Sequence, residues 1–144
     1  MNKKKQIAIV TGGAKRIGAS ICRRLHKANI NLIIHYKTSE KEAISLQDEL
    51  NKHRKNSASL IQADLLNPKS YSKIINEAIK IYGQLNFLIN NASTYYPTKI
   101  NQIDQLNWDN LIGSNLKAPL FLCKEAAPFL KKKNGSIINI TDAH

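Results

Sequence analysis

The segment Gln6-Ile7-Ala8-Ile9-Val10-Thr11-Gly12-Gly13-Ala14-Lys15-Arg16-Ile17-Gly18 decides the fold. It begins with a short run of apolar and β-branched residues, which is typical of a buried parallel strand. Glycines end that run, and apolar residues then recur at helical spacing over about 15–29. A second apolar run follows at 31–36. Together they predict a strand, a tight turn, a helix and a second, parallel strand.

The same alternation continues along the chain. Three further strand-like runs and four further helical patterns are present, at 58–63, 85–89 and 136–141 and at 39–55, 68–82, about 103–111 and about 114–131. This alternation predicts an α/β fold, a doubly wound parallel sheet in the order 3-2-1-4-5, formed by residues 1–144 as one domain. The chain stops soon after its fifth strand, which leaves an apolar edge uncovered, so we expect the sheet to be truncated there.

Two helices carry more specific expectations. Ser39 followed by Glu42 has the spacing of a capping box. The helix over about 114–131 is apolar nearly all round, through Leu116, Leu120, Phe121, Cys123, Ala127 and Leu130. We expect this helix to lie between the sheet and another helix, for instance one from a second subunit.

Composition limits the classes of protein to which the chain can belong. Its 144 residues, 42% hydrophobic and 22% charged, suit one globular domain, and no apolar run approaches the roughly 18–20 residues of a membrane-spanning helix. The basic start at 1–5 precedes no small-residue cleavage site, so we expect a cytoplasmic protein. Cys22 and Cys123 lack metal-ligand spacing, which predicts reduced thiols and no metal site.

The formal charge of +12 favours an anionic partner, either a nucleic acid, a membrane surface or a phosphorylated cofactor. The lysines are scattered apart from clusters at 3–5 and 131–133. The second cluster falls at a predicted helix end, where cations complement the helix dipole. Few aromatic residues are available to stack on bases, so we expect a solvated basic surface rather than a nucleic-acid or membrane site.

The turn after the first strand has the features of a phosphate-binding site. A nucleotide diphosphate needs a tight turn, a closely approaching backbone and the positive end of a helix, and this junction offers all three. The spacing departs from G-x-G-x-x-G, and a glycine-rich turn alone is weak support for nucleotide binding. Its place after the first strand of a βαβ pattern nevertheless favours a nucleotide site.

The end of the second strand indicates which nucleotide would bind. The run His35-Tyr36-Lys37-Thr38-Ser39 lacks the acid that holds a ribose 2′-OH in NAD sites, and with Arg16 it offers donors to a 2′-phosphate. This favours NADP(H). Ser39 can equally cap a helix, and His35 can be an internally bonded strand-end histidine. Asp64 can border an adenine or cap a turn.

These residues together resemble the short-chain dehydrogenase/reductases, and within them the pteridine reductases. The shared motifs are Thr11-Gly12-x-x-x-Arg16-x-Gly18, His35-Tyr36-x-x-Ser39, Asp64-Leu65, Asn90-Asn91-Ala92-Ser93, Tyr95-Tyr96-Pro97, Asn115 and Asn139-Ile140-Thr141-Asp142. The resemblance covers the whole chain but only the N-terminal part of the family's length. It implies a Rossmann-like domain, NADPH as cofactor, a pterin or dihydrofolate-like small-molecule substrate, and a homo-oligomer for a complete protein.

The resemblance also implies roles for individual residues. Those that would bind the cofactor are Gly12, Arg16, Ile17 and Gly18 at the diphosphate, His35, Tyr36, Lys37 and Ser39 at the 2′-phosphate, Asp64 and Leu65 at the adenine, and Asn91, Ala92 and Ser93 at the ribose and phosphates. Ser93 and Tyr95 would contact substrate, Tyr95 by stacking on the flat ring. Asp142 and Asn115 would belong to the catalytic set, although Asn115 also suits an ordinary polar helix position.

The family's catalytic Tyr-x-x-x-Lys after the fifth strand is absent from these residues. Tyr95 and Lys99 have the same spacing, but they follow the fourth strand and Pro97 lies between them, which disfavours a helical turn. Three hypotheses remain: an incomplete and inactive reductase, a non-catalytic NADP(H)-binding module, and, as the weakest, a basic nucleic-acid-binding protein.

Overall fold

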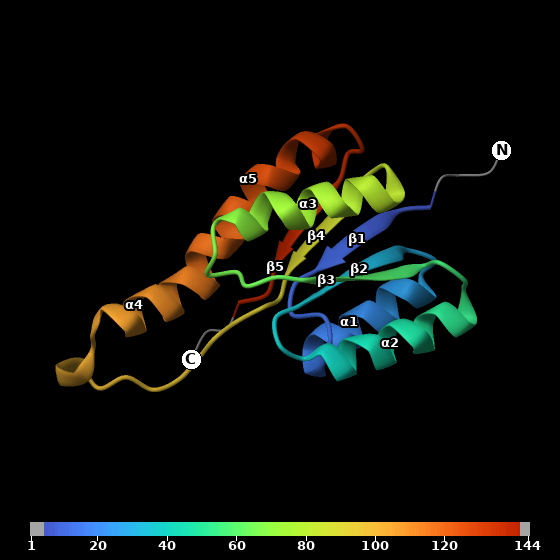
Figure 1. The fold of residues 1–144 in the computed structure, drawn as a ribbon. Helices are drawn as coiled ribbons and strands as arrows, with labels where there is room; N and C mark the ends of the chain where they lie inside the picture. Colours follow the sequence, from blue (N-terminus) through green and yellow to red (C-terminus); the bar gives the residue numbers. More distant parts are fainter. Residues whose placement is uncertain (1–4, 142–144) are drawn as a thin grey trace.

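The computed structural model describes residues 5–141, which form a single sheet covered by helices on both faces (Figure 1). The strands are β1 (Ile7–Val10), β2 (Asn31–Tyr36), β3 (Ala58–Gln62), β4 (Phe87–Asn90) and β5 (Ser136–Asn139). All neighbouring strands pair in parallel, in the order β3-β2-β1-β4-β5. The predicted fold class and strand order are confirmed.

Helices α1 (Arg16–Lys27) and α2 (Glu40–His53) cover one face of the sheet, and α3 (Lys69–Tyr82) and α5 (Ala118–Lys131) cover the other (Figure 1). The strands alternate between the two cores. Ile9, Ile33 and Leu88 point toward α3 and α5, whereas Val10 and Ile34 point toward α1 and α2. Because both faces are buried, the central strands are apolar over most of their length, and the polar residues of β2 and β4 lie at or near the strand ends.

A third helical region leads into α5. A 3-10 turn, η1 (Ile100–Gln102), precedes α4 (Gln105–Ile112), which continues through a π turn, η2 (Gly113–Lys117), directly into α5. Asp104 caps α4 by accepting the Asn107 amide at 2.8 Å. The helices predicted over about 103–111 and 114–131 are therefore confirmed, and the π turn that joins them is a feature that the sequence pattern did not reveal.

One local prediction was wrong. Ser39 occupies the N-cap of α2, but its side chain makes no capping hydrogen bond within residues 5–141, so the predicted capping box does not form. Helix α5 buries Leu122 and Leu130 against the sheet and α3, while Leu116 in η2 and Leu120 in α5 are 61% and 62% exposed. The outer face is open in the single chain, and its cover by a second subunit stays a prediction.

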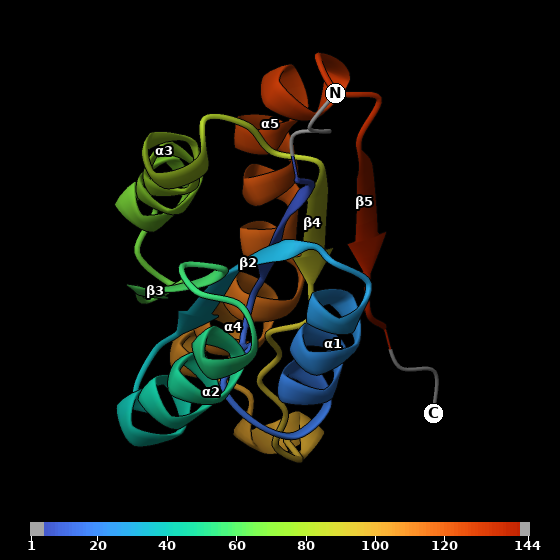
Figure 2. The same cartoon turned by 90° about the vertical axis from the view of Figure 1, so that its right-hand side faces the viewer.

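Strand β5 forms one edge of the sheet (Figure 2). Ile137, Ile138 and Ile140 in and after this strand are 38–47% exposed, as expected for an apolar edge strand with no neighbour on its outer side in this structure. Among residues 5–141, no helix is both long enough and apolar enough to cross a bilayer. The same part of the chain contains no cluster of three or more His, Cys, Asp or Glu side chains suited to a metal ion.

Candidate nucleotide-binding site

The turn from β1 to α1 lies at the carboxyl edge of the sheet, against the segment that follows β4. Gly12 has a φ of +59°, and a Cβ atom there would lie 3.0 Å from the Ala92 Cα. A Cβ on Gly18 would lie 2.7 Å from the Asn91 Nδ2 and closer still to the Gly12 carbonyl. Glycine is required at both positions because the two segments approach each other so closely.

Thr11 and Asn91 lock these segments together. The Thr11 hydroxyl oxygen accepts the amides of Asn91 and Ala92, each at 3.0 Å. The Asn91 Nδ2 donates to the carbonyls of Thr11 and Gly12 at 3.0 and 3.1 Å. The sequence analysis predicted that Asn91 and Ala92 lie at the site but gave Thr11 no role. The threonine directly before the first glycine was the one sequence feature that could have indicated this role.

The start of α1 is the feature of this edge best suited to an anion. Backbone amides in the first turn of a helix have no intrahelical acceptor, and the helix dipole adds positive potential there. Arg16 and Ile17 belong to this first turn and are exposed, whereas Gly18 is buried beneath it. Lys15 and Arg16 add two cationic side chains. The residues predicted for a diphosphate are thus brought together at one helix N-terminus.

Arg16 has an unusual backbone conformation. Its φ of +51° lies in the left-handed region, where a side chain costs roughly 1–2 kcal/mol relative to glycine. Such strain is concentrated at functional sites. This conformation makes Arg16 a candidate functional residue.

His35 is placed differently from the sequence expectation. Its side chain is 2% exposed, with Nδ1 accepting the Gly12 amide at 3.1 Å and Nε2 bonded to the Ala63 carbonyl at 3.0 Å. Burial lowers the pKa of the ring to about 4, against the opposing effects of the Ala63 carbonyl and the Asp64 carboxylate. The prediction that His35 is a cationic donor to a 2′-phosphate is wrong; the internally bonded alternative is correct.

The other predicted residues at and after the end of β2 differ in burial. Tyr36 is buried beside Ala14 and Ala43, where burial, and then the Glu40 carboxylate, raises the pKa of its hydroxyl. Lys37 is exposed at the mouth of the site. Ser39 is half-buried beside it, without the capping contact that was its alternative role.

Lys37 pairs with Asp64 across the carboxyl edge, Nζ to Oδ2 at 2.9 Å. Burial alone would raise the pKa of Asp64, but the Leu66 amide and the Lys37 ammonium outweigh it and hold the pKa below its usual value. The Asp64 Oδ1 accepts that amide at 3.0 Å, so Asp64 also caps the turn after β3. Leu65 is buried beneath this turn. Asp64 thus combines the turn-capping role with a position at the edge of the site.

On the substrate side, Ser93 is exposed and Tyr95 is 79% exposed. Asn115 lies in the π turn, where its side chain accepts the Thr94 amide at 3.2 Å and donates to the Thr94 carbonyl at 2.7 Å. Residues 91–99 form an irregular segment, so Tyr95 and Lys99 are not aligned on a helical turn. Asp142, the other predicted catalytic residue, lies outside the described residues.

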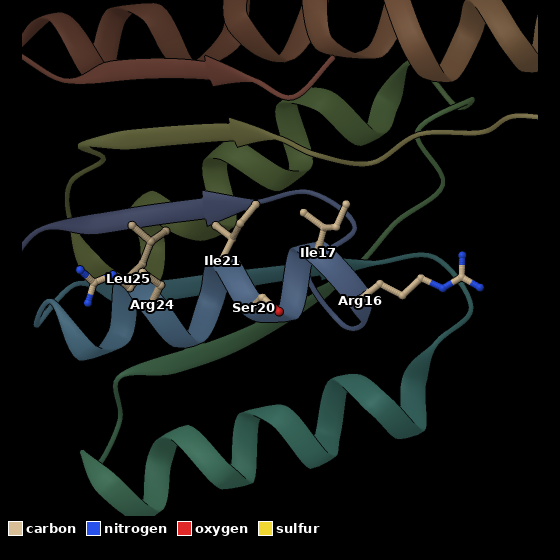
Figure 3. A pocket seen from close by; sticks show the side chains of 6 residues that line it. All are labelled: Arg16, Ile17, Ser20, Ile21, Arg24 and Leu25. Atoms are coloured by element: carbon tan, nitrogen blue, oxygen red, sulfur yellow. The ribbon is translucent and has the colours of Figure 1, made fainter. Parts of the chain in front are cut away.

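Two hollows border Arg16. One of about 650 Å3 runs along α1, lined by Arg16, Ile17, Ser20, Ile21, Arg24 and Leu25 (Figure 3). In Figure 3 the apolar side chains lie along one side of the helix, whereas Arg16 extends from its N-terminal end. The second hollow, of about 500 Å3, lies between α1 and α2 and includes Lys15, Arg23 and Lys41. The first hollow lies outside the β1–α1 turn, whereas the second is bordered by Ala14 and Lys15 of that turn. The candidate nucleotide site is the turn together with the start of α1 and Lys37.

Comparisons with known proteins agree with this geometry. The short chain dehydrogenase family model matches residues 6–143. Pteridine reductase 1 of Leishmania tarentolae is 32% identical over 95% of this chain and 61% of its own length. A 3-oxoacyl-(acyl-carrier-protein) reductase of Staphylococcus aureus is 29% identical over 96% of this chain and 56% of its own.

A solved structure extends the comparison. The blue fluorescent protein from a metagenomic library, crystallised in complex with NADPH, superimposes with a TM-score of 0.92 and is 28% identical over 99% of this chain and 58% of its own. The chain thus spans roughly three fifths of the length of the proteins that it matches. Since the family model covers nearly all of its residues, the chain belongs to the short chain dehydrogenase family.

Proposed function

We propose that this chain is the NADPH-binding part of a reductase that acts on a pteridine or a dihydrofolate-like ring. The observation that carries the proposal is the combination of the open N-terminus of α1 at Arg16 with an exposed Lys37 directly after β2. Strand β2 itself contributes no carboxylate, and the Asp64 carboxylate that pairs with Lys37 follows β3. NADPH differs from NADH by one phosphate, so a cation at this position discriminates between the two cofactors.

The turn at Gly12 and Gly18 fits a diphosphate. Side chains are excluded there by the close approach of Asn91 and Ala92, and the amides in the first turn of α1 are left to bind the ligand. Arg16, Ile17 and Gly18 would hold the diphosphate, with the guanidinium neutralising its charge. The same arrangement would place Asn91, Ala92 and Ser93 beside the ribose and phosphates.

The Lys37–Asp64 pair fits the adenosine end of NADPH. Lys37 and Ser39 would bind the 2′-phosphate, with His35 and Tyr36 supporting them from the buried side. Asp64 and Leu65 would border the adenine. The low pKa of Asp64 keeps this carboxylate ionised at neutral pH, so it would accept the adenine amino group and orient Lys37 at the same time.

On the substrate side, Tyr95 would stack on a flat heterocycle and Ser93 would contact its polar edge. NADPH supplies the hydride in such reductions, and the protein positions the ring and delivers the proton. Asn115 would hold the strand-four segment in place through Thr94, and Asp142 would join it in the catalytic set. We expect residues 1–144 to bind NADPH without turnover, because proton delivery in the family depends on a Tyr-x-x-x-Lys after the fifth strand that these residues do not include.

The outer face of α5 supports the expected homo-oligomer. Leu116 in η2 and Leu120 in α5 are exposed and lie four residues apart, about one helical turn. Apolar side chains gathered in this way favour association with another protein surface. We expect a complete protein to use this face between subunits, in the cytoplasm.

A titration of residues 1–144 with NADPH and NADH, followed by fluorescence and thermal shift, tests the proposal. We expect micromolar NADPH binding and NADH binding at least about tenfold weaker, the effect of one charge-assisted contact. Lys37→Glu should remove this preference. Lys52→Glu, the same charge change at the far end of α2, is the matched control and should retain it.

The other outcomes separate the competing functions. A folded chain that binds neither nucleotide would contradict the proposal. Binding to DNA with a steep salt dependence, and no preference for NADPH, would favour the nucleic-acid hypothesis instead. Biopterin or dihydrofolate should add a further thermal shift to the NADPH-saturated protein, and a chain that binds NADPH with no such shift fits the non-catalytic binding module.

A further inference from the structure

The His35 ring joins three segments that meet at the carboxyl edge of the sheet. It extends from β2, and its two nitrogens reach the Gly12 amide and the Ala63 carbonyl at 3.1 and 3.0 Å. An amide can only donate, so Nδ1 must be the acceptor and Nε2 must carry the hydrogen. These contacts therefore select one neutral tautomer of the ring.

The backbone of His35 adds a second contact to the same turn. Its carbonyl accepts the Gly13 amide at 2.9 Å. Both glycine amides after β1 are thus bound by one residue, and neither faces a ligand. A diphosphate at this turn must then use the amides farther along, in the first turn of α1.

We propose that His35 is a positioning residue for the nucleotide site, and that its Nδ1 holds Gly12 in the conformation that directs the α1 amides toward a diphosphate. Gly12 has a φ of +59°. A free glycine populates many backbone conformations, so the turn needs a contact that selects this one. Holding Gly12 also sets the carbonyl to which Asn91 donates, so one ring fixes the relation between the turn and the strand-four segment.

The identity of the ligand, a diphosphate, rests on the function proposed above. The contact between His35 and Gly12 does not depend on that function. The ring keeps its acceptor at neutral pH because burial lowers its pKa to about 4. Loss of the acceptor should loosen the turn even without a nucleotide. Loss of the donor to Ala63 should loosen the end of β3 instead.

Two substitutions separate the two nitrogens. In His35→Asn, the side-chain oxygen can take the place of Nδ1 and accept the Gly12 amide, but no atom reaches Ala63. In His35→Gln, the side-chain amide can take the place of Nε2 and donate to Ala63, but the acceptor for Gly12 is lost. Each variant loses one buried hydrogen bond, so a purely structural role would affect the two about equally.

The first measurement needs no nucleotide. Hydrogen exchange of the Gly12 amide should be slow in the wild type and in His35→Asn, and at least about tenfold faster in His35→Gln. The second measurement is NADPH affinity, which should stay within about threefold of the wild type in His35→Asn and fall about tenfold in His35→Gln.

Equal exchange rates and equal affinities in the two variants would overturn the proposal. If the wild type binds no NADPH while Gly12 still exchanges faster only in His35→Gln, the proposed cofactor is wrong and the clamp on the turn is correct. If neither variant folds, nitrogen NMR of the wild-type imidazole decides: a hydrogen on Nδ1 would overturn the proposal, and a hydrogen on Nε2 with an acceptor Nδ1 would support it.

Discussion

The two halves of the sheet differ in how completely they bury their apolar and polar groups. Around β1, β2 and β3, His35 and Tyr36 are buried and the turn at Gly12 is bound on both sides. Along α4, η2 and α5, Trp108 and Leu120 are 59% and 62% exposed. The first half holds its β1–α1 turn in place through internal hydrogen bonds, whereas the second leaves apolar side chains exposed in the single chain. Substitutions in the two halves should therefore have different consequences.

The largest effect is expected for Gly18→Ala. The new Cβ would lie 2.7 Å from the Asn91 Nδ2 and press on the Gly12 carbonyl, so the turn must shift. We expect a loss of about 3 kcal/mol in the free energy of unfolding and no measurable NADPH binding. Gly113→Ala is the matched control, because its Cβ would meet only the flexible end of Leu66. Similar affinities for the two variants would contradict the rigid-site interpretation.

The second effect is the pH dependence that the buried ring imposes. The folded-state pKa of His35 is lowered to about 4 from 6.5, so the unfolded chain takes up the proton first as the pH falls. This contribution to stability is complete above pH 6.5 and is lost as the pH falls toward 4. We expect the stability advantage of the wild type over His35→Asn to shrink by about 2 kcal/mol from pH 7 to pH 5, measured by urea unfolding. If the stability difference between the wild type and His35→Asn does not change with pH, the pKa of His35 is the same in the folded and unfolded chains.

Arg16→Gly should separate stability from binding. Glycine removes the strain of a φ of +51°, so we expect unfolding to cost about 1 kcal/mol more. NADPH affinity should nevertheless fall about tenfold, because a charge-assisted contact is lost. Asn134→Gly, at a φ of +49° far from the turn, should leave affinity unchanged. An Arg16→Gly variant that binds NADPH normally would remove Arg16 from the site.

The smallest effect is expected on the outer face of α5. Leu120→Ser should change the free energy of unfolding by less than about 0.5 kcal/mol and leave NADPH affinity unchanged, because the side chain is 62% exposed. Leu122→Ala, two residues along and 1% exposed, should cost about 3 kcal/mol. Thermal and urea unfolding of both variants would check this difference within one helix. Equal costs would mean that the outer face is buried in solution.

Much of the fold could be predicted from the sequence because hydrophobic periodicity is strong here. The apolar strands, the helical repeats and the glycine at the end of α3 each have a direct physical cause, and right-handed connections then fix the strand order. The π turn could not be predicted in this way, because a five-residue change of helical winding leaves the apolar pattern almost unaltered. Ser39 shows a related limit, since its residue type suits both a cap and a ligand.

At the site, sequence reasoning located segments better than side-chain directions. Strand ends of a parallel sheet meet at one edge, so the grouping of Gly12, Asp64 and Asn91 followed from the strand assignments. Whether His35 turns inward or outward depends on the alternation of side chains at the last residues of β2, and its partners come from two other segments. Thr11 was missed for the same reason: its partners follow β4, far along the sequence.

The contact between Asn115 and Thr94 has a consequence for how the chain tolerates changes in length. One side-chain amide pairs with both the N–H and the C=O of Thr94, as a neighbouring strand would. Thr94 is therefore anchored from the π turn, whatever the path of the chain between them. Insertions or deletions near η1 should change the path of the chain between Thr94 and α4 without moving the residues that follow β4. We therefore expect that the segment between Thr94 and α4 can vary in length while the β1–α1 turn and the residues after β4 keep their positions.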